Sequence, residues 1–329
     1  MDELQNENIT ETKSLAPETE VVEETTTEGG DVLTKGVMNE MNMQKVTTKQ
    51  RVMKILVQIG LYLFLGIMAL IVVFPFYWMI ISSLKSLTEY EYTNPTFYPH
   101  EIHFENYANA FADMNMTRLF LNTVYVGVVS TLLSLVVTIL AAFAFARLEF
   151  KGKNTFFAML LATMMIPGEL FTITNYITIN RLEWMHTFTA LIVPFLVSVF
   201  YIYLLKQNFE QVPNELYLAA KVDGTSDFKY LVRVMVPLAL PTIISITILK
   251  MMGSWNSYMW PKLVANDDLH KLITNGLREM NFAEDGSLGR THYPRQMAAV
   301  TMVSIPLFLV FVFLRKYIMK GVSRSGIKG

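Results

Sequence analysis

The chain alternates between long apolar runs and short polar connections from about residue 55 to residue 318. A helix rises about 1.5 Å per residue and needs roughly 20 residues to cross the hydrocarbon core of a bilayer. Six segments are long and apolar enough, at 55–82, 119–146, 155–177, 187–206, 236–260 and 296–318. The pattern predicts an all-α, polytopic membrane protein with six transmembrane helices.

Helix-breaking residues interrupt three of these segments. Pro167 and Pro194 fall in the third and fourth segments, and the fifth contains Pro237, Pro241 and Gly253. The interior of a helix bundle tolerates such breaks when neighbouring groups satisfy the freed backbone carbonyls. We therefore expect these three segments to be irregular helices.

Residues 1–50 differ from the rest of the chain. They are rich in Glu, Thr, Asn and Gly and lack apolar periodicity, so they cannot bury enough surface to offset the entropy cost of ordering. Their acidic start and the apolar run that begins near Ile55 are unlike a cleaved signal peptide. We predict a disordered, acidic cytoplasmic tail at 1–50 and one membrane domain at 51–329.

Basic residues indicate the orientation, because the cytoplasmic flanks of membrane spans are enriched in Lys and Arg. They collect before the first span, after the second, around 206–233 and after the sixth. The connection between the third and fourth spans carries only Arg181, although the connection before the sixth span is also basic. We predict that both termini lie in the cytoplasm.

Composition restricts the possible chemistry. Of the 329 residues, 52% are apolar and 17% are charged, which is outside the usual range of a soluble domain. There is no cysteine for a disulfide or thiolate site, and the five scattered histidines do not indicate a metal. The sequence has no Gly-x-x-x-x-Gly-Lys-Ser/Thr phosphate loop and no evident catalytic set. We expect a chain that is not an enzyme, holds no metal or cofactor, and binds no nucleic acid.

One polar connection, residues 207–235, is too regularly patterned for an ordinary loop. Residues 213–215 suit the start of a helix, and Gly224 suits the left-handed turn that ends it. Residues 225–226 can cap a second helix that runs toward Pro237. Such an elbow could transmit a push from a partner to the spans beside it. An amphipathic helix at the membrane surface is the alternative, and the residues alone favour it.

This connection resembles the signature loop of the permease subunits of binding-protein-dependent ABC importers. That loop reads Pro-x-Glu-Leu-x-Glu-Ala-Ala-x-x-Asp-Gly and continues to Leu-Pro-Leu-x-x-Pro. Ten positions match it, namely Pro213, Glu215, Leu216, Ala219, Ala220, Asp223, Gly224, Pro237, Leu238 and Pro241. Leu218 replaces the glutamate before the Ala-Ala pair, so an ion pair made there is missing or is supplied by Glu215. The resemblance implies that the 213–237 loop docks on an ATPase through Pro213, Glu215, Ala219, Ala220, Asp223 and Gly224.

Further motifs extend the resemblance over about residues 50–329. FENYANAF, AAFAFARLEFKGK, SWNSYMWP and the closing GVSRSGIKG are similar to the carbohydrate uptake branch, and specifically to its second maltose-type permease subunit. The resemblance implies a type I ABC importer permease in the bacterial plasma membrane, forming the translocation path as a heterodimer with a second permease. It also implies an ATP-binding subunit dimer that holds ATP and Mg, and an extracytoplasmic sugar-binding protein. Gly326, Lys328 and Gly329 would form a tail that contacts the ATPase.

The substrate path has candidates at two spans. Trp255, Asn256 and Tyr258 lie at the outer end of the fifth span, where they could contact a sugar, although an interfacial aromatic belt is the favoured alternative. Lys250 lies roughly mid-span, where a charge is costly unless it faces the bundle interior or water. We therefore expect it to line a cavity or a partner interface. Asn175 and Tyr176, near the outer end of the third span, follow the same reasoning.

The favoured function is the permease subunit of an ATP-driven sugar importer, with an oligosaccharide as the expected cargo. One alternative keeps this mechanism but changes the cargo to glycerol-phosphate, a polyamine or another small solute. A second alternative is a self-sufficient secondary carrier. Such a carrier would show intramembrane acids for ion coupling, and Glu169 is the only carboxylate placed within a span.

Overall fold

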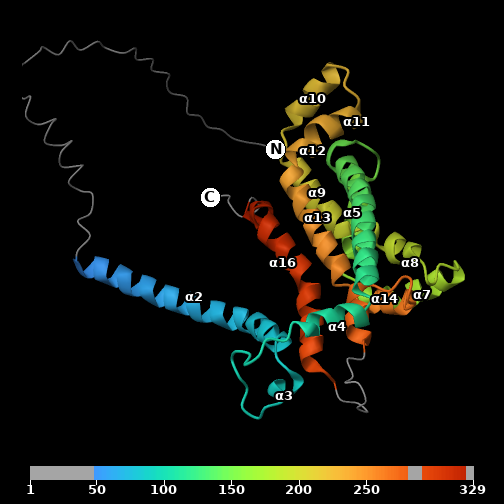
Figure 1. Ribbon diagram of the computed structural model, residues 1–329. Coiled ribbons are helices and arrows are strands. Elements are labelled where there is room, and N and C mark those ends of the chain that lie inside the picture. The colour runs from blue at the N-terminus through green and yellow to red at the C-terminus, as the bar shows by residue number, and fades with distance from the viewer. Residues whose placement is uncertain (1–47, 281–290, 324–329) are drawn as a thin grey trace, which may run out of the picture. The chain divides into compact units, whose positions relative to one another are not determined.

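The computed structural model describes residues 48–280 and 291–323, and every regular element in those ranges is helical (Figure 1). The chain divides into two compact units, Met1–Ala69 and Leu70–Gly329. Most of the predicted tail, residues 1–47, lies outside the described residues. Its last three residues belong to helix α2 (Thr48–Ser83).

Three long helices match the first, second and sixth predicted segments. They are α2, α5 (Met116–Arg147) and α16 (Tyr293–Ser323). Each contains a stretch long and apolar enough to cross a membrane. From residue 51 to residue 69 the side chains of α2 are exposed, as expected for a surface that lipid or another chain covers.

The other three predicted segments are pairs of helices that meet at sharp bends. The third is α6 (Lys153–Thr163), then η1 (Gly168–Phe171) and α7 (Thr172–Arg181), bent by 87°. The fourth is α8 (Phe188–Ile192) with η2 (Val193–Phe195), then α9 (Val199–Glu210), bent by 45°. The fifth joins Asp227–Leu238 to α13 (Leu240–Trp255), bent by 79°. If each bent pair counts as one span, the described residues hold up to six spans.

Prolines explain two of these bends, as the sequence indicated. Pro241 has no N–H for the carbonyl one turn earlier, and α12 (Val236–Leu238) accordingly ends before α13 begins. Pro167 disfavours helical geometry at the preceding residue, where the third segment breaks. The expected break at Gly253 is wrong, because α13 continues through that residue to Trp255. The expected fifth span also overran α13, since α14 (Met259–Val264) is a separate helix.

Helix α5 is the central element of the second unit. It packs against α9 and α13, while α13 also contacts α16 and α16 contacts α4 (Glu105–Asp113). The face that α5 buries carries small polar residues, including Thr123, Ser130, Ser134 and Thr138. Small residues allow membrane helices to approach closely, which accounts for this tight packing.

Three buried apolar clusters run along α5. One joins its first turns to α4, α15 (Ile273–Glu279) and α16, and a second joins its middle to α7, α8 and α14. The third lies toward the other end of α5 and joins it to α9, α11 (Asp227–Tyr230) and α13. The elbow, residues 213–237, is therefore packed against the bundle at one end of its central helix.

Candidate functional site

The elbow has the two helices that the sequence predicts. Helix α10 (Asn214–Val222) follows Pro213, and Gly224 adopts a left-handed conformation with φ of 70°. Thr225 N–H donates to the Ala220 carbonyl at 2.8 Å, and Gly224 N–H donates to the Lys221 carbonyl at 3.0 Å. These two bonds close the helix in the pattern that favours glycine. Helix α11 then begins at Asp227, and the side chain of the preceding residue, Ser226, caps it by accepting a hydrogen bond from Lys229 N–H.

Three side chains hold the two elbow helices together. Tyr217 donates to Asp227 Oδ1 at 2.7 Å, and Lys221 Nζ lies 2.7 Å from the same oxygen. The hydrogen bond from Lys221, followed by that from Tyr217, lowers the pKa of Asp227. The bond to Asp227 raises the pKa of Lys221, and desolvation, followed by the same carboxylate, raises the pKa of Tyr217. Both charges of the pair are therefore present at neutral pH.

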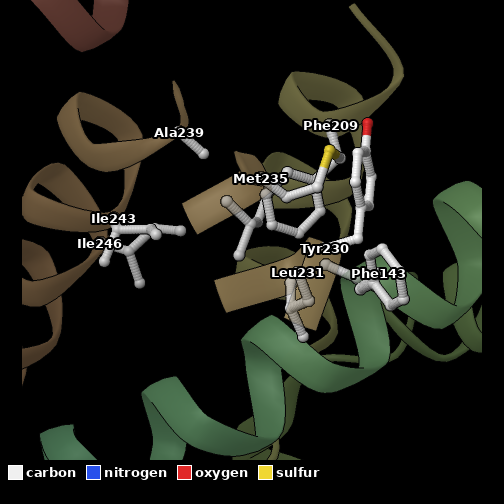
Figure 2. Packing of buried hydrophobic residues seen from close by; sticks show 10 residues of the cluster. Phe143, Phe209, Tyr230, Leu231, Met235, Ala239, Ile243 and Ile246 are labelled. Atoms are coloured by element: carbon white, nitrogen blue, oxygen red, sulfur yellow. The ribbon is translucent and has the colours of Figure 1, made fainter. Parts of the chain in front are cut away.

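The second elbow helix is anchored in the bundle core. Tyr230 and Leu231 are buried, together with Met235, in one cluster with Phe143 of α5 and Phe209 of α9. Figure 2 shows this packing, in which the rings of Tyr230 and Phe143 are 6.4 Å apart. A densely packed core transmits displacement because it deforms little. Movement of α11 would therefore displace α5, α9 and α13.

Arg147 ties the elbow to the end of α5. Its buried guanidinium donates to the Phe209 carbonyl at 2.8 Å and also to the Val212 carbonyl. A longer bond of 3.5 Å reaches the side chain of Asn214, the first residue of α10. The planar fork of arginine suits several oxygens at once. One side chain thus connects the end of α5 to the end of α9 and the start of α10, which are 62 and 67 positions away in the sequence.

The outer surface of the elbow exposes apolar side chains. Leu218 is 56% exposed, Val222 89% and Phe228 67%, and Leu216 is also exposed. The predicted contact residues Pro213, Glu215, Ala219, Asp223 and Gly224 are exposed as well, and Ala220 is half-buried. Apolar groups that gather on one exposed helix pair indicate a surface for another protein. Leu218 would give such a contact an apolar group where the signature loop that this segment resembles has a carboxylate.

Lys250 lies on the wall of a cavity. The cavity has a volume of about 390 Å³ and is bounded by α5, α8, η2, α9, α13 and α14. The Lys250 ammonium donates to the Phe195 carbonyl at 2.6 Å, across the bend of the fourth segment. Trp260, which also lines the cavity, donates from its indole N–H to the Ala190 carbonyl at 2.9 Å.

The other candidate path residues lie elsewhere. Trp255 is buried in the cluster at the start of α5, 5.7 Å from the ring of Phe120. Asn256 is exposed and donates to the Met252 carbonyl, while Tyr258 accepts from Lys262 and carries Arg278 over its ring. Asn175 is exposed on α7, and Tyr176 packs against the middle cluster. Gly326, Lys328 and Gly329 of the predicted tail lie outside the described residues.

Sequence reasoning did not assign roles to Arg147, Tyr217 or Asp227. A basic residue that ends an apolar run was interpreted only as an orientation signal. Tyr217 and Lys221 are one helical turn apart, and this spacing could have identified them as neighbours on α10. Their common partner on α11 could not be found from local spacing, since it depends on the angle of the elbow.

Comparisons with known proteins agree on one family. A family model described as "Binding-protein-dependent transport system inner membrane component" matches residues 134–324. The chain is 28% identical over 264 residues to the arabinooligosaccharides transport system permease protein AraQ of Halalkalibacterium halodurans, covering 79% of this chain and 93% of that one. It is 30% identical over 268 residues to the sn-glycerol-3-phosphate transport system permease protein UgpE of Rhizobium meliloti, with coverage of 79% and 93%.

A relative and a solved structure extend this picture. The diacetylchitobiose uptake system permease protein NgcG of Streptomyces coelicolor is 28% identical over 259 residues, covering 78% of this chain and 84% of its own length. The fold is also similar to a chain in the crystal structure of a bacterial ABC transporter involved in the import of the acidic polysaccharide alginate. The TM-score is 0.71 at 22% identity, with coverage of 82% of this chain and 98% of that chain.

Proposed function

Because the chain belongs to the family of binding-protein-dependent transport system inner membrane components, we propose that it is the permease subunit of an ATP-driven sugar importer. Its cargo is a sugar, and an oligosaccharide in particular. The names of relatives support this cargo, since the permeases for arabinooligosaccharides and for diacetylchitobiose both match over most of the chain. The family is one of transporters, so the chain works by conformational change and the energy comes from an ATPase partner.

In the proposed assembly the chain pairs with a second permease and forms the translocation path with it. An ATP-binding subunit dimer, which holds ATP and Mg, docks on the elbow from the cytoplasm. A sugar-binding protein delivers the cargo from the other side of the membrane. This arrangement requires both termini to lie in the cytoplasm, as the distribution of basic residues predicts.

The observation that carries the proposal is the elbow itself. Its outer face exposes Leu218, Val222 and Phe228, while its inner face is tied to the bundle by Arg147 and Tyr230. A surface amphipathic helix would need no such anchorage to the ends of two spans. The anchorage is what a lever requires, because force applied to the outer face must reach the membrane helices.

A charge placed on the exposed face tests the docking role. Leu216→Asp should reduce copurification of the ATP-binding subunit at least tenfold, because a carboxylate would be desolvated against an apolar contact at this exposed position. Leu182→Asp is the matched control, since Leu182 follows α7 outside the elbow and is 49% exposed. Equal recovery of the ATP-binding subunit with both variants would show that the elbow is not the docking site.

An uptake panel tests the cargo. The complex, purified with its partners and reconstituted in liposomes, should take up a neutral or acidic oligosaccharide with ATP and its binding protein. Glycerol 3-phosphate belongs in the panel because UgpE transports it by name. If glycerol 3-phosphate is the only solute taken up, the cargo is a phosphate ester and not a sugar. Uptake by this chain alone, driven by an ion gradient, would refute the importer mechanism.

A further inference from the structure

The cavity beside Lys250 has the size and position of a binding site. Its volume of about 390 Å³ is within the range of small-molecule sites in proteins. It lies between the middle of α5, the bend of the fourth segment and α13. Broken helices beside a cavity within a membrane protein are a common way to present backbone groups to a transported solute.

The lining of this cavity combines apolar side chains with several hydroxyl groups and one kind of charge. Hydroxyl groups come from five residues, Ser130, Ser198, Tyr201, Ser254 and Ser257. Lys250 is the single charged residue in the lining, and none of the lining residues that the structure describes is acidic. The cavity therefore combines several hydrogen-bonding groups with an ammonium whose charge no lining carboxylate balances.

The hydrogen bond to Phe195 leaves the Lys250 ammonium incompletely satisfied. An ammonium has three N–H donors, and the bond to the Phe195 carbonyl uses one of them. That carbonyl is neutral, so no described residue of the cavity lining compensates the positive charge of Lys250. A charge at this depth is costly unless a counter-charge or water reaches it. A bound anion would supply the counter-charge and accept the remaining hydrogen bonds.

We propose that this cavity is a binding subsite for an anionic, polyhydroxylated solute, with Lys250 as the residue that selects its negative charge. The inference rests on the proposed function and narrows it, because it assigns the cargo to the acidic sugars. The carboxylate of a uronic acid and a phosphate ester offer the same chemistry to an ammonium. The hydroxyl groups from α5, α9 and α13 would bind the sugar hydroxyls.

A purely structural role for Lys250 makes a different prediction. If the ammonium only ties α13 to the bend at Phe195, its loss would impair every solute alike. If it selects charge, its loss would impair anionic solutes while neutral ones pass as before. The comparison of two solutes within one variant therefore separates the two roles.

The first experiment measures this comparison in the reconstituted complex. Uptake of a uronic-acid trisaccharide, a neutral trisaccharide and glycerol 3-phosphate is followed for wild type and for Lys250→Met. We expect uptake of the anionic solute to fall about tenfold or more, as loss of one unit charge near a ligand predicts, with neutral uptake within about twofold. Lys262→Met removes the same charge from α14 outside the cavity lining and should change neither. An equal loss for charged and neutral solutes would overturn the proposal.

The second experiment does not depend on the cargo. The chain has no cysteine, so Ser254→Cys gives it a single thiol. Ser254 lies one turn after Lys250 on α13 and also lines the cavity. Anionic and cationic methanethiosulfonate reagents are compared by the mass shift of this chain in the intact complex. At the roughly 6 Å between positions i and i+4, an ammonium should change each rate about tenfold at an effective dielectric constant of about 40.

The anionic reagent should therefore react faster than the cationic one, and adding Lys250→Met should abolish the preference. The uronic-acid trisaccharide should protect the thiol more than the neutral trisaccharide does. Absence of any charge preference would refute the subsite even if sugar uptake is normal. Conversely, a charge preference in a complex that transports no sugar would refute the proposed cargo and leave the anion subsite standing.

Discussion

Replacement of Arg147 by methionine is the sharpest test of the elbow as a lever. The change removes the guanidinium that bonds to the Phe209 and Val212 carbonyls while it keeps an unbranched apolar stem. The apolar cluster around Tyr230 and Phe143 stays intact. The substitution therefore cuts the connection between α5 and residues 209–212, which lead into the elbow, and leaves the packing in place.

The size of the effect follows from those bonds. A hydrogen bond from a charged donor contributes about 1.5–3 kcal/mol, so the two main-chain bonds contribute about 3–6 kcal/mol. Burying the guanidinium costs part of this, and we expect a net loss of about 2–4 kcal/mol. At 1.4 kcal/mol per factor of ten, the aligned elbow becomes about 30- to 700-fold less favoured relative to detached positions.

The assay is uptake per ATP hydrolysed in the reconstituted complex. The complex that contains Arg147→Met should still hydrolyse ATP, but its uptake per ATP should fall at least tenfold. The reason is that the ATPase then moves an elbow that no longer carries α5 with it. Lys151→Met is the control, since it removes a basic residue from the exposed loop after α5. Arg147→Lys should give an intermediate value, because one ammonium cannot reproduce the fork. Uptake per ATP within twofold of wild type in Arg147→Met would refute the reasoning.

Two further predictions concern the elbow. Gly224→Val should lower uptake per ATP without preventing membrane insertion, because the left-handed backbone conformation costs a residue with a side chain about 1–2 kcal/mol. Gly60→Val is the control, since Gly60 lies in a helix with similarly open surroundings, and this variant should behave as wild type. Normal coupling in Gly224→Val would show that the turn can change shape freely. Asp227→Asn should reduce uptake per ATP by less than about fivefold, since the pair with Lys221 is partly exposed. The lowered pKa of Asp227 means that the pair stabilises the elbow above pH 3.8 and is lost only as the pH falls through the lowered value. The raised pKa of Lys221 means that it is lost only as the pH rises beyond 10.5. Titration of this pair should therefore leave uptake per ATP constant between pH 5 and pH 9. A loss of uptake with pH in this range that Asp227→Asn removes would contradict the conclusion that both groups stay charged.

Local pattern was sufficient for the elements and insufficient for their contacts. Hydropathy located α2, α5 and α16, since a span must be long and apolar whatever its neighbours are. Capping chemistry located α10 and α11, because Gly224 and Ser226 act on residues within one turn of themselves. The bend angles could not be predicted, since a proline permits a bend and the surrounding helices set its size.

In the candidate site, too, local pattern predicted some residues but not the contacts between distant parts of the chain. Lys250 was identified because a charge within a span is costly regardless of which helices surround it. The hydroxyl groups beside it come from three stretches of the chain, and nothing in any one stretch marks Ser130 or Ser257 as a cavity residue. Arg147 was missed for the same reason, because its partner Phe209 is 62 positions away in the sequence.

The three helices that carry the elbow also form walls of the cavity, which gives the proposed coupling a physical route. Helix α9 begins beside the cavity at Ser198 and ends just before the elbow, so its 12 residues span about 18 Å. Helix α5 carries Ser130 in the cavity and Arg147 at its last turn, and α13 begins just after the elbow and carries Lys250. Helices are stiff over such lengths, so displacement of the elbow must move all three walls or detach from one. Arg147→Met detaches α5. In that variant the thiol of Ser254→Cys should keep its preference for anionic reagents, which depends on Lys250. Its reactivity should change less when ATP is added than it does with Arg147 in place, because only two of the three walls still move with the elbow.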